Sequence, residues 1–357
     1  MATPRFWLGV AVTAAFVGLL LLRIDYGEMV DALARANYAW LIPAVIVYFF
    51  SFAMRSIRWR FLLRPFHPQV RATRLFPVIL IGYMANNLLP MRLGELVRGY
   101  FLSTREPVRG STAFATIVAE RAFDGFTLLL LLAAAAAYIS VDDLLAFASG
   151  ALGLPKALIA VGVVIPYALA IAFIVLVSMA PDSAKRLARS VVKLLPARVS
   201  GRAYDQLERF INGFEGLHRP TRLLALLLLS LPVWFAELAV YYIVALGFGL
   251  QDHFDSLAAM FAALALMAAM SNLATALPSS QGAVGPFEFF AVLSLEALGV
   301  GVGLATAYAV VLHLAVLLPP IAVGLGYLAV RGIAFGQLTG RRRTAEGEQA
   351  AARERER

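Results

Sequence analysis

Charged and amide side chains interrupt the hydrophobic sequence at one stretch in the first half of the chain. Residues 86–98 read NNLLPMRLGELVR, so two amides, a proline, two arginines and a glutamate follow an apolar run. A guanidinium can hold a phosphate through two parallel hydrogen bonds. Arg92 and Arg98 are therefore candidate phosphate ligands, and Asn86, Asn87 and Glu95 are candidate neighbours of the same ligand.

A similar stretch occurs in the second half of the chain. Residues 89–94 and 277–282 both read Leu-Pro-x-x-x-Gly, each after an apolar segment that contains asparagine. Each then leads into a short apolar segment with a glutamate near its start, which is Glu288 in the second copy. The second copy offers neutral hydrogen bonds from Ser279, Ser280 and Gln281. A charged and a neutral copy together would suit an anionic headgroup with further polar substituents.

Three charges lie together inside a third apolar segment, residues 111–138. Glu120 and Asp124 share a helix face at i,i+4, and Arg121 can reach Asp124 at i,i+3. Charges inside a membrane are costly and usually mark function. The alternative is a self-neutralising cluster that braces the helix or lies at the membrane interface. We favour the functional interpretation.

Two further titratable groups lie alone in apolar segments. Glu237, in the run Trp-Phe-Ala-Glu, has no basic residue within one turn. It must find a partner on another helix, with Arg92, Arg98 and Arg121 as candidates, or remain protonated. His313 can titrate near neutral pH, although a hydrogen-bonded packing role is more usual for such a histidine.

The composition is that of a polytopic membrane protein. The 357 residues are 61% hydrophobic and 15% charged, with a mean hydropathy of +0.79. The net charge of +9 points to loops that face anionic lipid rather than to nucleic acid. The chain has no cysteine, which excludes disulfides and thiolate sites, and its four histidines are scattered. We therefore expect no metal, no cofactor and no catalytic residue.

The apolar runs predict an all-α protein with six full transmembrane helices and two broken, re-entrant hairpins. Residues 76–89 are too short to cross, since fourteen residues reach about 21 Å against a hydrocarbon core of about 30 Å. Residues 1–140 form a first repeat, with spans 6–22, 38–54 and 111–139 and a hairpin at 76–102. Residues 141–335 form a second repeat, with spans 157–179, 222–246 and 303–330 and a hairpin at 257–298.

Loop charge predicts the orientation of these spans in the cell membrane. Six arginines follow residue 54 without an acid among them, which places that loop and both chain termini in the cytoplasm. A basic amphipathic segment, 184–218, would lie on the cytoplasmic leaflet or pack on other loops, and 336–357 would be a disordered cytoplasmic tail. The first half then begins inside and the second outside. This is an inverted-topology repeat, which implies alternating access to a site between the two hairpins.

Four stretches together resemble one known family. NNLLPMRLGELVRGYFL, ATIVAERAFD, WFAELAVYYIVALG and LPSSQGAVGPFEFFAVL occur in order and are similar to the lysylphosphatidylglycerol synthase/flippase membrane-domain family, which includes the membrane half of multiple peptide resistance factors. The likeness covers roughly residues 5–335. The positions that the resemblance carries over are Asn86, Asn87, Pro90, Arg92, Gly94, Glu95, Arg98, Glu120, Arg121, Asp124, Glu237, Pro278, Gly282 and Glu288.

The resemblance implies a lipid translocase, best described for aminoacylated phosphatidylglycerol. Two departures bear on the cargo. Relatives often have an arginine near the position of His313, and the soluble aminoacyltransferase half does not follow the membrane domain in this sequence. The chain therefore need not make the lipid that it moves.

The leading hypothesis is a non-enzymatic, flippase-like protein that moves an anionic or aminoacylated phospholipid, or a lipid-linked headgroup, between leaflets. Its partners would be membrane phospholipids, in a cavity and at the basic loops, with a second copy of the chain and a separate lipid-modifying enzyme as further candidates. Two alternatives remain open. One is a proton-coupled transporter of a small amphiphilic or anionic solute, with Glu237 or His313 carrying the proton. The other is a non-catalytic membrane subunit of a lipid-modifying enzyme.

Overall fold

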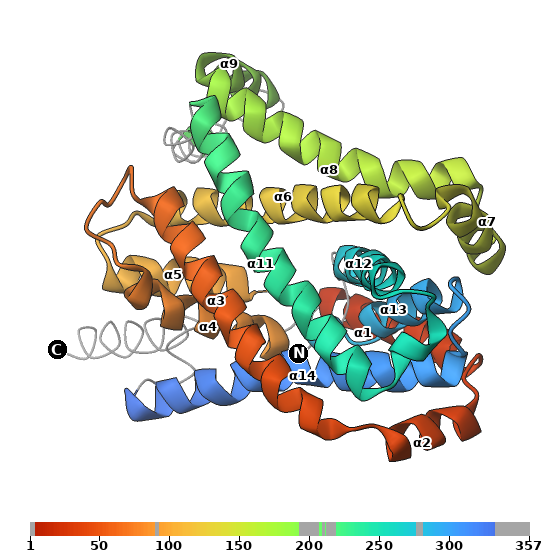
Figure 1. The fold of residues 1–357 in the computed structure, drawn as a ribbon. Coiled ribbons are helices and arrows are strands. Elements are labelled where there is room, and N and C mark those ends of the chain that lie inside the picture. The colour runs from red at the N-terminus through yellow and green to blue at the C-terminus, as the bar shows by residue number, and fades with distance from the viewer. Residues whose placement is uncertain are drawn as a thin grey trace.

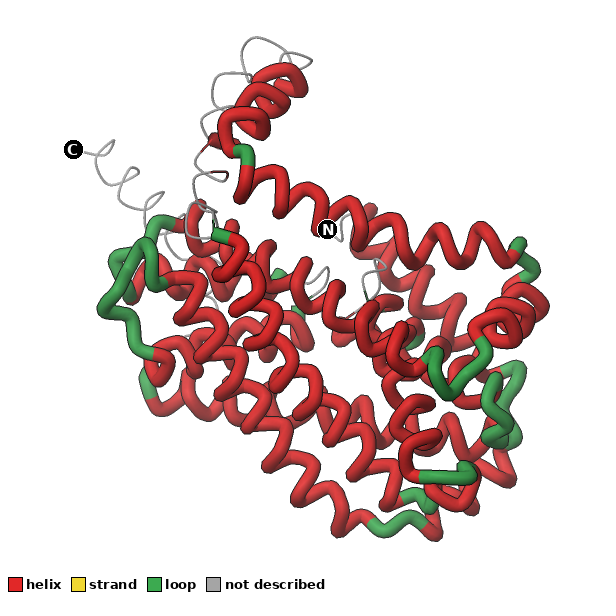
Figure 2. Tube along the Cα trace, turned by 45° about the horizontal axis from the view of Figure 1, so that its top comes forward, coloured by secondary structure: helices red, strands yellow, loops and turns green. Residues whose placement is uncertain are grey.

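The fold is known from a computed structural model that describes residues 4–89, 93–192, 207–208, 211, 219–275 and 281–332. Every regular element in these ranges is helical, as Figures 1 and 2 show. The chain is an all-α, multi-pass membrane protein, as the composition predicts.

The described part of the first half contains six α-helices. They are α1 (Pro4–Leu21), α2 (Tyr26–Arg35), α3 (Leu41–Leu63), α4 (Ala72–Leu88), α5 (Gly94–Arg105) and α6 (Gly110–Ala135), with a short 3-10 turn at Tyr38–Trp40. The second half contains α7 (Val141–Leu152), α8 (Lys156–Met179), α9 (Pro181–Val192), α11 (Pro220–Gly247), α12 (Leu257–Ala274), α13 (Pro286–Glu296) and α14 (Val302–Val330), with 3-10 turns at Leu250–His253 and Gln281–Ala283.

The predicted count of six full spans is not confirmed. Among the described residues, four segments are long and apolar enough to cross a membrane: Tyr38–Leu63, α11, α12 and α14. A fifth results if α1 and α2, which meet at 92°, are counted as one bent span. Helix α6 carries three charges near its middle, and α12, predicted as half of a hairpin, is itself long enough to cross.

Two segments that lie between the predicted spans, 26–35 and 141–152, are helices. Asp25 accepts a hydrogen bond from the backbone N–H of Glu28 (3.0 Å) and caps α2, and Ser140 accepts one from that of Asp143 (3.3 Å) and caps α7. Both are N-cap patterns with an acid three residues later. The signal is therefore present in the sequence. Of the predicted segment 184–218, helix α9 covers the beginning; most of the rest, and the tail 336–357, lie outside the described residues.

Both Leu-Pro-x-x-x-Gly stretches separate two helices that pack on each other. Helices α4 and α5 are in close contact where Gly82 meets Gly94, and a Cβ atom at residue 94 would overlap the carbonyl oxygen of Gly82. Helices α12 and α13 also pack on each other. Gly282 and Gly285 have φ of 67° and 97°, in the left-handed region that favours glycine. Residues 90–92 and 276–280 lie outside the described part.

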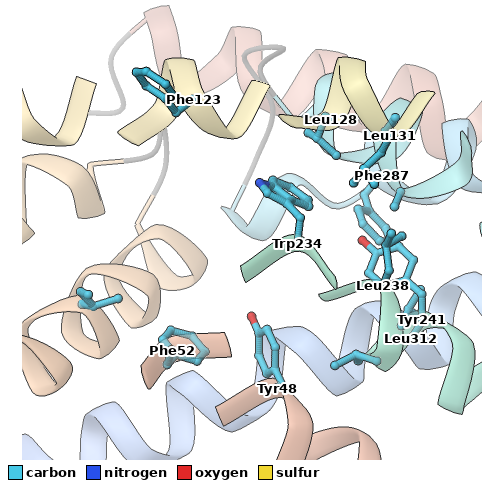
Figure 3. Packing of buried hydrophobic residues seen from close by; sticks show 14 of the residues in the cluster. Tyr48, Phe52, Phe123, Leu128, Leu131, Trp234, Leu238, Tyr241, Phe287 and Leu312 are labelled. Atoms are coloured by element: carbon cyan, nitrogen blue, oxygen red, sulfur yellow. The ribbon is translucent and has the colours of Figure 1, made fainter. Parts of the chain in front are cut away.

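The two halves are packed together along α3 and α11, which lie side by side near the centre of Figure 1. Helix α4 of the first half packs on α14 of the second, and α12 of the second packs on α6 of the first. Figure 3 shows Trp234 of α11 between Phe123 of α6 and Tyr48 of α3. One helix of each pair is thus held against the long helix of the opposite half, and the other, α5 or α13, packs on the long helix of its own half.

Candidate functional site

Helix α3 carries two arginines into the protein interior, which the sequence analysis did not predict. The predicted span ends at residue 54, with Arg55 and Arg58 in a cytoplasmic loop, but α3 continues to Leu63 and both side chains are buried. The apolar residues 61–63 beyond them were the available signal. The helix can bury these charges because carboxylates on α6 and α11 face them.

Arg58 is fully buried and binds two acids of α6. Its Nη1 lies 2.6 Å from Oδ1 of Asp124, and its Nη2 lies 3.3 Å from Oε1 of Glu120. Nη1 also donates to the hydroxyl of Ser230 on α11, at 3.0 Å. The indole N–H of Trp234 donates to the same oxygen of Asp124, at 3.1 Å. One side chain thus joins α3, α6 and α11.

Arg55 is the partner of Glu237. Its Nη2 lies 2.8 Å from Oε2 of Glu237, and its Nη1 lies 3.9 Å from Asp124. The prediction that Glu237 needs a basic partner from another helix is confirmed, but the partner in the structure is Arg55, which was not among the three predicted candidates. Of these, Arg98 and Arg121 have other partners, and Arg92 lies outside the described residues.

Arg98 of α5 pairs with the remaining oxygen of Glu120. Its Nη2 lies 2.6 Å from Oε2 of Glu120, and its guanidinium stacks 3.7 Å above the indole ring of Trp59. Both the ion pair and the cation–π contact favour the charged guanidinium in this buried position. Arg98 was predicted to bind phosphate; here it binds a carboxylate.

Arg121 occupies the more exposed end of the cluster. Its Nε lies 3.3 Å from Glu95 of α5, and its Nη1 lies 3.5 Å from Asp124, which confirms the predicted i,i+3 contact. The side chains of Arg121 and Glu95 are 31% and 26% exposed, compared with 1% for Glu120. The pair therefore marks where the cluster approaches the surface.

These contacts join four arginines and four carboxylates into one charge network. Its members are Arg55, Arg58, Arg98, Arg121, Glu95, Glu120, Asp124 and Glu237, whose formal charges sum to zero. Hydrogen bonding in the network is incomplete. Within the described structure, the buried Nε atoms of Arg55, Arg58 and Arg98 have neither a hydrogen-bond nor an ion-pair partner. Oδ2 of Asp124 has ion-pair contacts of 3.5 and 3.9 Å but no hydrogen bond. Such a network can accept a ligand that supplies both acceptors and donors.

Glu288 and His313 form a second, separate site. Oε1 of Glu288 lies 2.5 Å from Nδ1 of His313, and Oε2 accepts the backbone N–H of Gly285 at 2.7 Å. The ring of Phe287 stacks on the imidazole, with centroids 4.1 Å apart. The structure thus divides the residues predicted for one site between two.

The two sites have a shared design. Glu95 and Glu288 each lie in the first turn of the helix that follows a Leu-Pro-x-x-x-Gly stretch. Each pairs with a basic residue on the next long helix: Arg121, eleven residues after the first residue of α6, and His313, eleven residues after the first residue of α14. The two pairs therefore occupy equivalent positions in the two halves.

Comparison with known proteins identifies the family of this chain. The model of the family described as the lysylphosphatidylglycerol synthase TM region matches residues 6–324. The chain belongs to this family. No solved structure matches it.

Two relatives of this chain have different kinds of name: one is named only as a membrane protein and the other as an enzyme. A UPF0104 membrane protein of Methanothermobacter thermautotrophicus is 27% identical over 290 residues, which cover 78% of this chain and 80% of the relative. The glycosyltransferase AglD of Haloferax volcanii is 27% identical over 312 residues, which cover 81% of this chain but 48% of the relative. The chain therefore spans about half the length of the glycosyltransferase.

The other predicted site residues of this family member have varied surroundings. Asn87 donates from Nδ2 to the backbone carbonyl of Leu317 (3.2 Å) in α14, just before two prolines. Oδ1 of Asn86 is buried and has no partner in the described part of the chain. Gln281 is exposed. Ser279 and Ser280, like Arg92, lie outside the described residues.

Proposed function

We propose that this protein is a lipid translocase that moves an anionic or aminoacylated phospholipid, or a lipid-linked headgroup, between the leaflets of the cell membrane. The observation that carries the proposal is the set of unfilled hydrogen bonds in the charge network. The unpartnered Nε groups of Arg55, Arg58 and Arg98 suit a phosphate, and Oδ2 of Asp124, which makes no hydrogen bond, suits an amine. A headgroup that carries both would satisfy the network without adding net charge to it.

A purely structural role explains the charge network less well. Replacing buried ion pairs by apolar residues is often neutral or stabilising by about 1–4 kcal/mol, so packing alone does not require eight charges. Ionisable groups inside membrane proteins usually mark the path of a substrate. The network also joins α3, α5, α6 and α11, and so connects elements from both halves of the chain.

The arrangement of the halves supports alternating access as the mechanism. Helices α4 and α12 each pack on the long helix of the opposite half, and the pairs Glu95–Arg121 and Glu288–His313 are equivalent. An inverted repeat with two re-entrant hairpins would produce both features. In this proposal, one pair faces each side of the membrane, both termini are cytoplasmic, and the basic loops contact anionic lipid.

A membrane subunit of a lipid-modifying enzyme is the second candidate, because one relative is named a glycosyltransferase. Here the chain would present a lipid to a separate catalytic partner rather than act as the enzyme itself. A proton-coupled solute transporter is the third candidate and rests on Glu237 and His313 alone.

Reconstituted vesicles test the proposal directly. Fluorescent phosphatidylglycerol, lysyl-phosphatidylglycerol and phosphatidylcholine are each placed in vesicles with and without the protein, and a membrane-impermeant reductant reports the lipid in the outer leaflet. We expect the protein to accelerate exchange of at least one of the first two lipids. Rates equal to those of protein-free vesicles for all three would contradict the proposal.

A matched pair of substitutions then tests the network itself. Arg98→Lys keeps the positive charge next to Glu120 but removes the planar group with its unpartnered Nε. Lipid exchange should fall while the folded amount is maintained. Arg35→Lys, at a side chain that is 83% exposed on α2, is the control and should leave exchange unchanged.

A further inference from the structure

A cavity of about 440 Å³ lies between α1, α2, α13 and α14, and none of its lining residues belongs to the charge network. Its walls are largely aliphatic. Of the hydroxyls in the walls, that of Tyr26 donates to the carbonyl of Leu21, and that of Thr306 donates to the carbonyl of Val302. Glu288 and His313 are the remaining polar side chains of the lining. The size falls within the range of ligand cavities, about 300–1,000 Å³.

The amphipathic helix α2 forms one wall. Tyr26, Met29 and Leu33 follow each other at helical spacing and all line the cavity. The helix is fixed to the start of α14, where the carboxylate of Glu28 accepts the backbone N–H of Gly303 at 2.8 Å. An acid at a helix N-terminus is also favoured by the helix dipole. The wall is thus held in place by a specific contact.

His313 brings one polar atom without a partner to this cavity. The residue is only 5% exposed, and its Nδ1 is bound to Glu288, which also accepts the N–H of Gly285. Among the residues that the structure describes, Nε2 of His313 has no hydrogen-bond partner. Because His313 lines the cavity, a ligand inside it can supply the missing hydrogen-bond partner.

We infer that this cavity binds a single hydrocarbon chain whose end carries an uncharged hydroxyl group, as in a monoacylglycerol. The aliphatic walls fit the chain, and a charged end group without a counterion would be costly there. Nε2 of an imidazole accepts a hydrogen bond when the ring is neutral and donates one when it is protonated. A hydroxyl can do either, so it satisfies His313 in both forms. The inference does not depend on lipid translocation.

Photo-crosslinking of the full-length protein in detergent tests this site. The probe is a monoacylglycerol with a diazirine in its chain, and mass spectrometry maps the labelled peptides. We expect label on α2, α13 and α14, displaced by unlabelled monoolein and at least tenfold less well by oleate or oleylamine. Label spread evenly over lipid-facing helices such as α8, or equal displacement by all three competitors, would overturn the inference.

Two substitutions on α14 separate filling of the cavity from damage to the fold. Val310 lines the cavity, so Val310→Trp should fill it and abolish the specific label. Leu318→Trp introduces the same side chain at a position on the same helix that is 55% exposed and outside the lining, so labelling should persist. Equal labelling of both variants would show that the chain does not occupy the cavity.

His313→Asn tests the polar end of the site. Asparagine keeps a donor near the position of Nδ1, facing Glu288, but has no atom at the position of Nε2. Monoolein should bind about fivefold more weakly, the equivalent of one hydrogen bond of about 1 kcal/mol. For a methyl-ether analogue that lacks the terminal hydroxyl donor, the affinities of the variant and of the native protein should differ less than they do for monoolein. Unchanged affinity for monoolein would exclude His313 as its ligand.

Discussion

Arg55 of α3 and Glu237 of α11 form a buried ion pair of 2.8 Å that joins the two halves of the chain. The two residues are 182 positions apart in the sequence, and each lies on one of the two helices that pack side by side in the centre. Arg55 also lies 5.3 Å from the ring of Tyr83 and 5.9 Å from that of Trp234. A headgroup that entered the network would compete for this arginine.

The Arg55–Glu237 pair leads to a prediction that separates folding from transport. Glu237→Gln and Arg55→Gln each leave a buried charge without its main partner, which should cost about 3–5 kcal/mol and lower the Tm in detergent. The double variant removes both charges and should recover most of that stability. Lipid exchange should be slower than in the native protein for both single variants and for the double variant. A double variant with native exchange would assign the pair to packing alone.

The close packing of α4 on α5 leads to the prediction that residue 94 must be glycine. Gly94→Ala would push the two helices apart because its Cβ overlaps the backbone of Gly82 and Asn86, and overpacking costs about 1–3 kcal/mol. Gly99→Ala on the same helix is the control. The nearest atom there is Cδ1 of Ile117 at 3.8 Å, so the alanine should be neutral or stabilising. The melting temperatures of the two purified variants test this prediction. Equal values would contradict the close approach of Gly94 to Gly82.

The positions of the long helices were largely predictable from hydrophobic runs and from the prolines that interrupt them. Periodicity and proline positions locate α3, α8, α11 and α14 to within a few residues, except where α3 continues past residue 54. The end of a span is hard to recognise when arginines follow it, because a buried arginine with a distant acid has the same sequence signature as a cytoplasmic loop. Only the tertiary partners distinguish the two.

The site was predictable in its residue types but not in its connections. Six of the eight members of the charge network, all except Arg55 and Arg58, were singled out as charged residues in or beside apolar segments: Glu95, Arg98, Glu120, Arg121, Asp124 and Glu237. The partners could not be inferred, since the ion pairs span up to 182 residues. Likewise, nothing in the sequence shows that His313 and Glu288 form a site separate from the charge network.

The Glu95–Arg121 pair is predicted to contact water at one stage of transport, since exposure of such a pair to hydrocarbon would be costly. The native chain has no cysteine, so labelling has no background. A membrane-impermeant thiol reagent should modify Glu95→Cys in folded protein and spare Ala119→Cys, which is buried on α6. Ala119→Cys should react after denaturation in detergent. Protection of Glu95→Cys in the folded state would place the pair against lipid or protein.

The equivalence of Glu95–Arg121 and Glu288–His313 predicts which substitutions His313 tolerates. His313→Arg would give the second half the ion pair that the first half already has, and the adjoining 440 Å³ cavity offers room for the longer side chain. Its stability loss should stay below about 1.5 kcal/mol. His313→Leu has a similar apolar volume but leaves Glu288 without its partner, which should cost about 3–5 kcal/mol. Melting temperatures of the two variants in the same detergent test the order, and a leucine variant as stable as the arginine variant would show that the two pairs are not equivalent.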